Sequence, residues 1–219
     1  MAESTTSPAP QPGSEPQPGT DQRLAKGARA RASIARHAAD VASVEGLTGV
    51  SIGRLATDLG LSKSGIATLF GTKEALQVAA VKSAREAFIE RVIAPSMAQP
   101  RGHDRLRVLI DRWFDHITDP TFPGGCFRVA TISEFDSKPG PVRDAIIEDR
   151  RDWLAFLATE IRRAQEQGCL GERNADVVAF EIEAVVSAAN TAQQMGDGWG
   201  VATARAIVDG LLGEAPARG

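Results

Sequence analysis

A short run of small and basic residues, Ser62-Lys63-Ser64-Gly65, is the part of this 219-residue chain best equipped to contact another molecule. Lysine supplies a positive charge, serine hydroxyls donate hydrogen bonds, and glycine lets another surface approach the backbone. These are the groups that contact DNA phosphates and base edges. A helix destined for a protein core would hardly begin with them, so we interpret the run as an exposed contact for nucleic acid.

Two short helices joined by a tight turn are predicted to position this run. The first helix has an apolar stripe at helical spacing, formed by Ile52, Leu55, Ala56 and Leu59. Ser51 is a good N-cap for it, Gly60 can end it, and Ser62 can cap the second helix. The second helix has apolar positions at Ile66, Leu69 and Phe70. This arrangement can place a helix in a DNA groove, although similar helix pairs also occur in ordinary helical bundles.

A third helix is predicted to begin after Gly71, with Thr72 as its cap and Lys73 in its first turn. Lysine at that place opposes the helix macrodipole. A phosphate beside Lys73 would remove the unfavourable interaction, which favours a DNA-binding role.

The string LSKSGIATLFGTKEAL, behind a capped helix, resembles the DNA-binding signature of the tetracycline-repressor (TetR) family of bacterial transcription regulators. The resemblance covers residues 32–81. It implies DNA contacts at Ser51, Ser62, Lys63, Ser64, Gly65, Thr68 and Lys73. The sequence departs at Ala67, where the family commonly has an aromatic residue, and at Leu69, where it has His or Tyr. Phosphate contacts made by those side chains are therefore in question here.

Charge is distributed unevenly along the chain, which has a net charge of −3. Residues 23–73 hold eight Lys or Arg and three acids, so this segment carries +5 and the remainder −8. A basic N-terminal domain on an acidic body is expected of a protein that touches DNA with one end. The run RLAKGARARA before the first helix is either a basic arm or a solvated helix start.

The chain is expected to be all-α, because no segment alternates polar and apolar residues over a useful length. We predict a disordered tail at 1–22, a helix-turn-helix domain at 23–73 with a first helix over about 28–45, a connecting helix at 74–94 ended by Pro95, and a larger helical ligand-binding and dimerisation domain at 95–219. No apolar run approaches the roughly 20 residues of a membrane span. Cys126 and Cys169 show no disulfide or zinc spacing, which fits a cytoplasmic protein.

The last two helices, about 175–195 and 200–212, are candidates for a homodimer interface. The first is apolar or small on nearly every side, which burial on one side only cannot explain. The resemblance likewise implies a homodimer interface of four helices, in which these two helices pack against their copies in a second subunit. A two-fold dimer also suits DNA, because its two recognition helices can address half-sites one turn apart.

A pocket for a small, largely apolar effector is implied in the C-terminal domain by the resemblance. Large side chains leave irregular gaps between helices, although each of them can equally be core. The candidates for its lining are Trp113, Phe114, Ile117, Phe127, Phe135, Trp153 and Phe156. The candidate polar anchors are His116, Thr131, Ser133 and Glu134.

Catalysis is not expected. A Cys126 nucleophile with His116 as base, or His103 paired with Asp104, would be the candidates, but both histidines are also well explained by their places in a helix. The sequence has no glycine-rich phosphate loop after a strand and no paired metal ligands, so no cofactor is expected. We therefore predict a ligand-responsive repressor that a small molecule releases from operator DNA. The alternative is a helical small-molecule-binding protein without specific DNA recognition.

Overall fold

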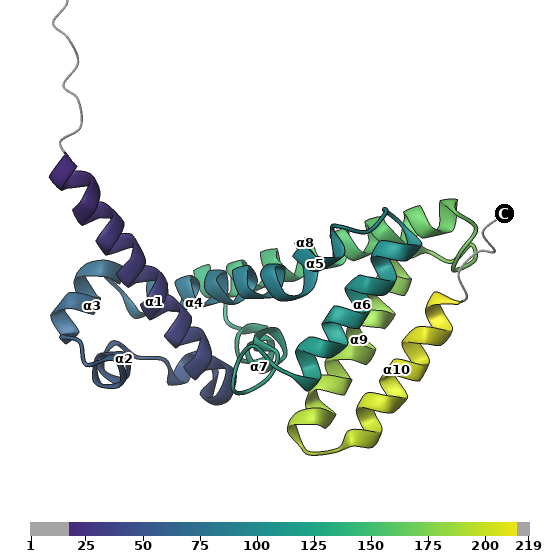
Figure 1. Cartoon of the computed structure of the whole chain (residues 1–219). Coiled ribbons are helices and arrows are strands. Elements are labelled where there is room, and N and C mark those ends of the chain that lie inside the picture. The colour runs from purple at the N-terminus through teal and green to yellow at the C-terminus, as the bar shows by residue number, and fades with distance from the viewer. Residues whose placement is uncertain (1–17, 214–219) are drawn as a thin grey trace, which may run out of the picture.

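Helices make up all the regular structure in the part of the chain that the computed structural model describes, residues 18–213. The elements are α1 (Pro18–Gly49), α2 (Ile52–Leu59), α3 (Lys63–Phe70), α4 (Lys73–Phe88), a π-helical turn η1 (Ile89–Ile93), α5 (Ala94–Ser96), α6 (His103–Thr118), α7 (Phe127–Phe135), α8 (Pro141–Glu166), α9 (Ala175–Gln194) and α10 (Gly198–Leu212). The all-α prediction is confirmed. Figure 1 shows α1–α3 as a head at one end and the neighbouring helices α9 and α10 at the other.

The first helix is longer than the predicted segment 28–45, because α1 begins at Pro18 and reaches Gly49. Alanine and arginine, both strong helix formers, dominate its middle and extend it. Gly46, with φ of 75°, introduces a kink before its last turn. The predicted tail at 1–22 lies, for residues 1–17, outside the described residues, and α1 begins within its remainder.

Every helix of the head contributes to one apolar core, which also takes in residues of α4, α7 and α8. Ile34 and Ala38 of α1 pack there with Leu55 of α2 and Ile66 of α3, and all four are buried. Leu76 brings α4 into the same core. The apolar positions that predicted the two short helices thus hold them against α1.

α4 joins the head to the body, since it packs against α1 on one side and α8 on the other. Its regular hydrogen bonding changes after Phe88, where the turn η1 follows, and Ala94 N–H bonds to the Ile89 carbonyl. Pro95 has no N–H to donate to the carbonyl four residues earlier and its ring crowds that turn. The regular α-helix thus ends at Phe88, before the predicted end at residue 94, and the π-helical turn and the short α5 carry the helical path on to Ser96.

The body is built around a second apolar core shared by α6, α8, α9 and α10. Three aromatic rings pack edge to face at its centre. The centre of the Trp153 ring lies 5.0 Å from that of Phe88 and 4.8 Å from that of Trp113. Such edge-to-face pairs are favoured by the ring quadrupole. This cluster joins the end of α4 to α6 and α8.

The loop between α6 and α7 docks the head onto the body. Gly124 N–H donates to the Ser43 hydroxyl at 3.0 Å, and the Arg36 guanidinium donates to the Thr121 carbonyl at 2.8 Å. A Cβ at Gly124 would lie 1.9 Å from the Ser43 carbonyl oxygen, so only glycine fits this approach. Nearby, Glu134 of α7 accepts a hydrogen bond from Thr48 N–H at 3.1 Å.

His116, near the end of α6, is a buried polar residue at this junction, where its Nδ1 lies 3.1 Å from the Thr121 hydroxyl. Burial, and to a smaller extent the positive charges of Arg128 and Arg91, lower the pKa of His116 to about 4. The imidazole is therefore neutral in the folded protein at neutral pH.

Among the described helices, none is both long enough and apolar enough to cross a membrane.

Replacing Gly124 by Ala is expected to destabilise the protein, because the added methyl group would collide with the backbone of Ser43. Overpacking of this kind costs about 1–3 kcal/mol, which urea denaturation measures. Gly53→Ala is the matched control, since its Cβ would make only ordinary contact, 3.6 Å from the Lys63 side chain. Equal stability of the two variants would show that the head does not approach the loop this closely.

Stability should decline between about pH 6.5 and pH 4 because of His116. In that window the unfolded chain binds a proton at this histidine that the folded protein does not, so the contribution is fully present above pH 6.5 and is lost toward pH 4. The slope from this residue is at most about 1.4 kcal/mol per pH unit. His116→Asn should flatten the pH profile of the unfolding free energy, and an unchanged profile would contradict a neutral, buried His116.

Candidate nucleic-acid interface and ligand cavity

Both short helices of the head begin and end as their sequence predicts. The Ser51 hydroxyl caps α2 by accepting from Arg54 N–H at 3.1 Å, and the Ser62 hydroxyl caps α3 by accepting from Gly65 N–H at 3.0 Å. Gly60 adopts the left-handed conformation with φ of 64° and ends α2. Leu61 N–H then returns to the Ala56 carbonyl at 2.9 Å, which closes the turn.

α3 presents its first half to solvent. Lys63, Ser64, Gly65 and Thr68 are exposed, whereas Ile66 is buried in the head core. The Thr68 hydroxyl donates to the Ser64 carbonyl at 2.8 Å, which leaves its lone pairs outward. Among the described side chains, Lys63 has no carboxylate partner. The helix therefore offers an uncompensated positive charge beside small polar groups.

The two remaining predicted contacts, Ser51 and Lys73, flank this surface. Ser51 is half-buried and its hydroxyl is engaged as the cap. Lys73 is exposed, and its Nζ donates to the Thr48 carbonyl at 2.8 Å, so this lysine also ties α4 to the end of α1. Six of the seven predicted DNA contacts thus lie on the head, five of them on or at the start of α3, and the seventh, Lys73, begins α4.

The departures at Ala67 and Leu69 have a local role. Both residues are partly buried, and Leu69 packs against the head core. The Leu69 carbonyl accepts a hydrogen bond from Arg31 of α1, whose guanidinium also lies 4.4 Å from the centre of the Phe70 ring. These contacts fix the end of α3 to α1.

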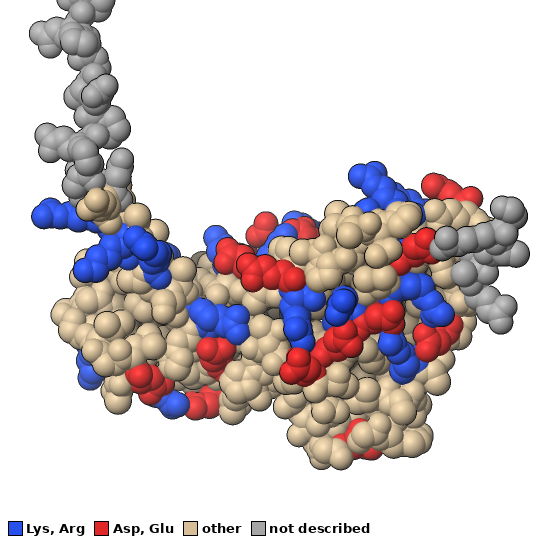
Figure 2. All heavy atoms as spheres, viewed as in Figure 1, with Lys and Arg blue, Asp and Glu red and all other residues tan. Residues whose placement is uncertain are grey.

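The basic charge of the head lies mainly on the first turns of α1. Arg23, Lys26 and Arg29 are exposed there, and no described carboxylate pairs with them. Figure 2 shows this cluster of blue side chains, while blue and red alternate over the body. Arg54, in contrast, pairs with Asp58 at 2.8 Å and with Glu45 at 3.2 Å. Hydrogen bonds from His37 and then Arg54 lower the pKa of Asp58.

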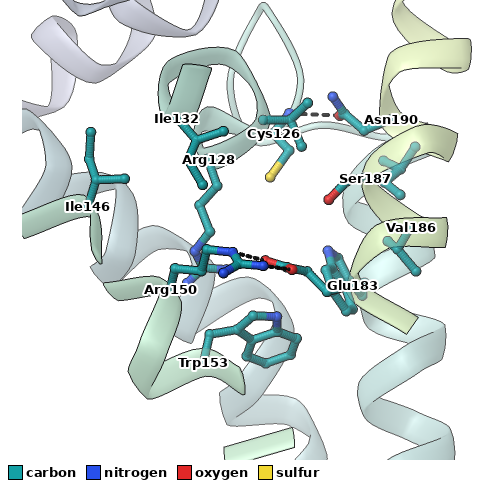
Figure 3. Close-up of a pocket in the computed structure, with 13 residues that line it drawn as sticks. Cys126, Arg128, Ile132, Ile146, Arg150, Trp153, Glu183, Val186, Ser187 and Asn190 are labelled. Carbon is teal, nitrogen blue, oxygen red and sulfur yellow. Dashed lines mark hydrogen bonds and ion pairs between the residues drawn. The ribbon is translucent and has the colours of Figure 1, made fainter. Parts of the chain in front are cut away.

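A cavity of about 90 Å³ lies in the body between α6, α7, α8 and α9. Its wall is mainly apolar and includes Trp113, Ile117, Val129, Ile132, Ile146, Trp153 and Val186. Its polar lining residues are Arg128, Arg150, Glu183, Ser187 and Asn190. Figure 3 labels the lining side chains that come from α7, α8 and α9, among them Arg128, Trp153 and Glu183, which surround one space.

Two arginine–carboxylate pairs border the cavity. Arg128 makes a two-pronged contact with the buried Asp149, with Nη2 3.0 Å from Oδ1. Arg150 makes a second such contact with Glu183, with Nε 2.8 Å from Oε1. Paired hydrogen bonds of this planar kind fix the orientation of both partners.

Three of the seven predicted lining residues, Trp113, Ile117 and Trp153, border this cavity. The other four do not. The Arg205 guanidinium carbon lies 4.7 Å from the centre of the Phe114 ring. Phe127 packs beside Phe122 in the head core. Phe135 packs against the head core as a partly buried residue, and the Phe156 ring lies beside that of Trp153, with the ring centres 6.3 Å apart.

The predicted polar anchors lie outside the cavity lining. His116 bonds to Thr121, Thr131 donates to the Phe127 carbonyl at 2.9 Å, Ser133 is exposed and Glu134 holds Thr48. The polar residues that do line it were missed, because a charged residue on a long helix is ordinarily solvated.

Cys126 contributes a buried thiol to the cavity wall, and its N–H donates to Asn190 Oδ1 at 2.9 Å. Burial raises the pKa of this thiol, although Arg128 opposes the shift. A reactive cysteine needs the opposite shift. Among the described residues, no cluster of three potential metal ligands occurs.

Comparison with known protein families gives a match for the body. Residues 102–208 match the family described as the tetracyclin repressor-like C-terminal domain. No curated protein matches the sequence.

Three solved structures illustrate the likeness of the whole fold. A TetR transcriptional regulator from Chloroflexus aurantiacus J-10-FL is 24% identical, with a TM-score of 0.76 over 84% of this chain and 94% of that one. AibR, in complex with isovaleryl coenzyme A and operator DNA, is 21% identical, with a TM-score of 0.66 over 83% and 98%. A putative transcriptional regulator from Saccharomonospora viridis, in complex with choline, is 19% identical, with a TM-score of 0.68 over 84% and 95%.

These likenesses extend over the head and the body together, and the body matches the family's own C-terminal domain. Residues 102–208 thus belong to the C-terminal domain of the tetracycline-repressor (TetR) family, and the chain as a whole has the fold of TetR transcriptional regulators.

Proposed function

We propose that this protein is a homodimeric regulator that binds operator DNA through α2 and α3 and leaves it when a small molecule occupies the body. The observation that carries the proposal is the exposed start of α3, where an unpaired lysine and small polar residues project from a firmly capped helix. Such a surface can enter a major groove, while Lys73 and the basic turns of α1 reach phosphates. AibR, of similar fold, is seen with operator DNA, which supports this assignment.

Dimerisation through α9 and α10 is supported by the apolar surface that these helices leave open in a single chain. One side of α9 is buried in the body through Val178, Ile182 and Val186. On other sides, Val177 is 51% exposed and Phe180 is 55% exposed. On α10, Trp199 is 75% exposed and Ile207 is 47% exposed, and large apolar side chains that gather on one surface ordinarily mark a binding site for protein. A second copy of the same two helices would cover it, as expected for an isologous interface.

A chain of contacts can carry a change at the cavity to the head. Arg128 lines the cavity and donates hydrogen bonds to the Asp149 carboxylate. Oδ1 of the same carboxylate lies 3.9 Å from Nε of Arg85 on α4. A ligand that displaced Arg128 would alter the hold of the body on α4. We propose that such a shift swings α4 and moves the two recognition helices out of register with successive major grooves. The ligand must bind the released conformation more tightly for this to occur.

The docking loop offers a second link between cavity and head. Cys126 in the cavity wall lies two residues from Gly124, which is bonded to Ser43 of α1. A displacement of the start of α7 would therefore be transmitted to α1 through the hydrogen bond between Gly124 and Ser43.

A helical ligand-binding protein without specific DNA recognition is the competing function, and Ala67 and Leu69 are the residues that favour it. DNA binding separates the two. We would measure fluorescence anisotropy with the DNA that flanks the protein's own coding sequence, over a salt series, with a random duplex as competitor. Tight, salt-dependent binding that resists the competitor supports the regulator. Lack of preference across the flanking and further candidate operators supports the competing function.

Lys63→Ala should weaken that binding and reduce the slope of log affinity against log salt by about one, because one phosphate contact is lost. Lys138→Ala is the charge-matched control, since Lys138 is exposed on the body beside Phe135. The proposal for α3 fails if both variants bind operator DNA as the unmodified protein does.

Ala188→Glu should split or destabilise the dimer. Ala188 is exposed on α9 in the single chain, and the proposed interface would bury the new charge without a partner. Gel filtration with light scattering measures the mass directly, and Ala155→Glu on the exposed side of α8 is the control. An intact dimer of the Ala188 variant would place the interface elsewhere.

A further inference from the structure

Two hydrogen-bond donors in the cavity lining lack an acceptor. Among the described residues, Arg128 Nη1 and Trp153 Nε1 are buried side-chain atoms without a hydrogen-bond partner, and both residues line the cavity. Trp153 is only 3% exposed. Leaving a buried donor unpaired is unfavourable, so native structures rarely do so without a reason. An acceptor brought by a ligand would supply that reason.

The charges around the cavity are already balanced. Arg128 is paired with Asp149, and Arg150 with Glu183, so each positive charge has its own carboxylate. An anionic ligand would add a buried charge without a partner and would face Glu183, while a cationic ligand would face two arginines. An uncharged acceptor avoids both costs.

The shape of the cavity sets the size of the group that it can hold. At about 90 Å³ it is smaller than the roughly 150 Å³ apolar cavity that holds benzene in a protein interior. Apolar side chains, among them Ile117, Ile132 and Val186, form most of its wall. Only a few non-hydrogen atoms, mostly apolar, can therefore fit without rearrangement.

Figure 3 shows how these groups are arranged. Trp153 lies below the Arg150–Glu183 pair, with its ring nitrogen on the side of α9, and the Arg128 side chain descends from α7 toward the same region. An acceptor in this space would face a donor from α7 and a donor from α8. These are the helices that the Arg128–Asp149 contact holds together.

We propose that the cavity binds the carbonyl group of a small, uncharged and otherwise apolar effector, with the Trp153 indole N–H and the Arg128 guanidinium as its hydrogen-bond donors. The proposal rests on the effector-responsive function proposed above and names the chemical class of the effector. Neutral ketones, esters and amides belong to this class. Occupancy would pair both unpartnered donors and draw on Arg128, the residue that links the cavity to α4 through Asp149.

Three probes of equal size and similar shape test the class: butanone, 2-methylbut-1-ene and propionate. They place a carbonyl oxygen, a methylene group and a charged carboxylate at the same position. The full-length protein, labelled with ¹⁵N in tryptophan, is titrated with each probe. The chain has three tryptophans, so the indole N–H signals are few and can be assigned with single Trp→Phe variants. We expect a saturable downfield shift of the Trp153 indole signal with butanone only.

Trp153→Phe removes the donor and keeps an aromatic ring, so butanone should bind about three- to tenfold more weakly. Trp113→Phe is the matched control, because Trp113 lines the same cavity and its nitrogen is not among the buried unpartnered atoms. Affinity for the variants is followed by ligand-observed NMR. If Trp153→Phe does not fold, the comparison of the three probes on the unmodified protein still decides the question.

Equal binding of butanone and the alkene would show an apolar cavity without carbonyl recognition, and tighter binding of propionate would overturn the charge argument. Absence of a saturable shift with all three probes would refute the site. These measurements are made without DNA. Failure of probe binding is therefore distinct from failure of operator binding, because the anisotropy experiment measures DNA binding without any small-molecule probe.

Discussion

The carboxylate of Asp149 is the constraint on which the arrangement of the body depends. It lies on α8 with its side chain only 9% exposed, and it holds Arg128 of α7 while facing Arg85 of α4. A buried carboxylate without partners is strongly unfavourable, so removing either contact would raise the energy of this arrangement. The Arg128 guanidinium also lies 4.0 Å from the centre of the Phe88 ring, which adds a cation–π contact to the end of α4. Three helices are thereby held around one charge.

This geometry places the cavity and the connecting helix in contact with the same arginine. One side of Arg128 lines the cavity, and the other side lies against Phe88 and Asp149. A ligand that binds in the cavity therefore does not need a long pathway to influence α4. The docking loop adds its own link through Gly124 and Ser43, so the head is held to the body at two separate places.

Head and body use charge differently. In the body, arginines on neighbouring helices meet carboxylates, as Arg107 meets Asp209 and Arg205 meets Asp111. Such pairs shape a surface of mixed sign. In the head, Arg23, Lys26 and Lys63 pair with no described carboxylate, so their positive charges remain available to attract an approaching anion. This difference supports the proposal that only the head faces a polyanion.

Most of the helices can be predicted from local sequence patterns, because capping residues, glycines and apolar spacing act over a few neighbouring positions. Ser51, Gly60 and Ser62 behave as their types predict, and the exposed start of α3 follows from the spacing of Ile66 and Phe70. Which large side chains border the cavity and which fill a core depends instead on how the helices pack. Trp113 and Trp153 border it, whereas Phe114 and Phe127 do not, although all four are large aromatic residues. The packing of the helices also determines that Arg128, Arg150 and Glu183 turn inward, because burial of a charge depends on a partner from another helix, and local spacing carries no information about that partner.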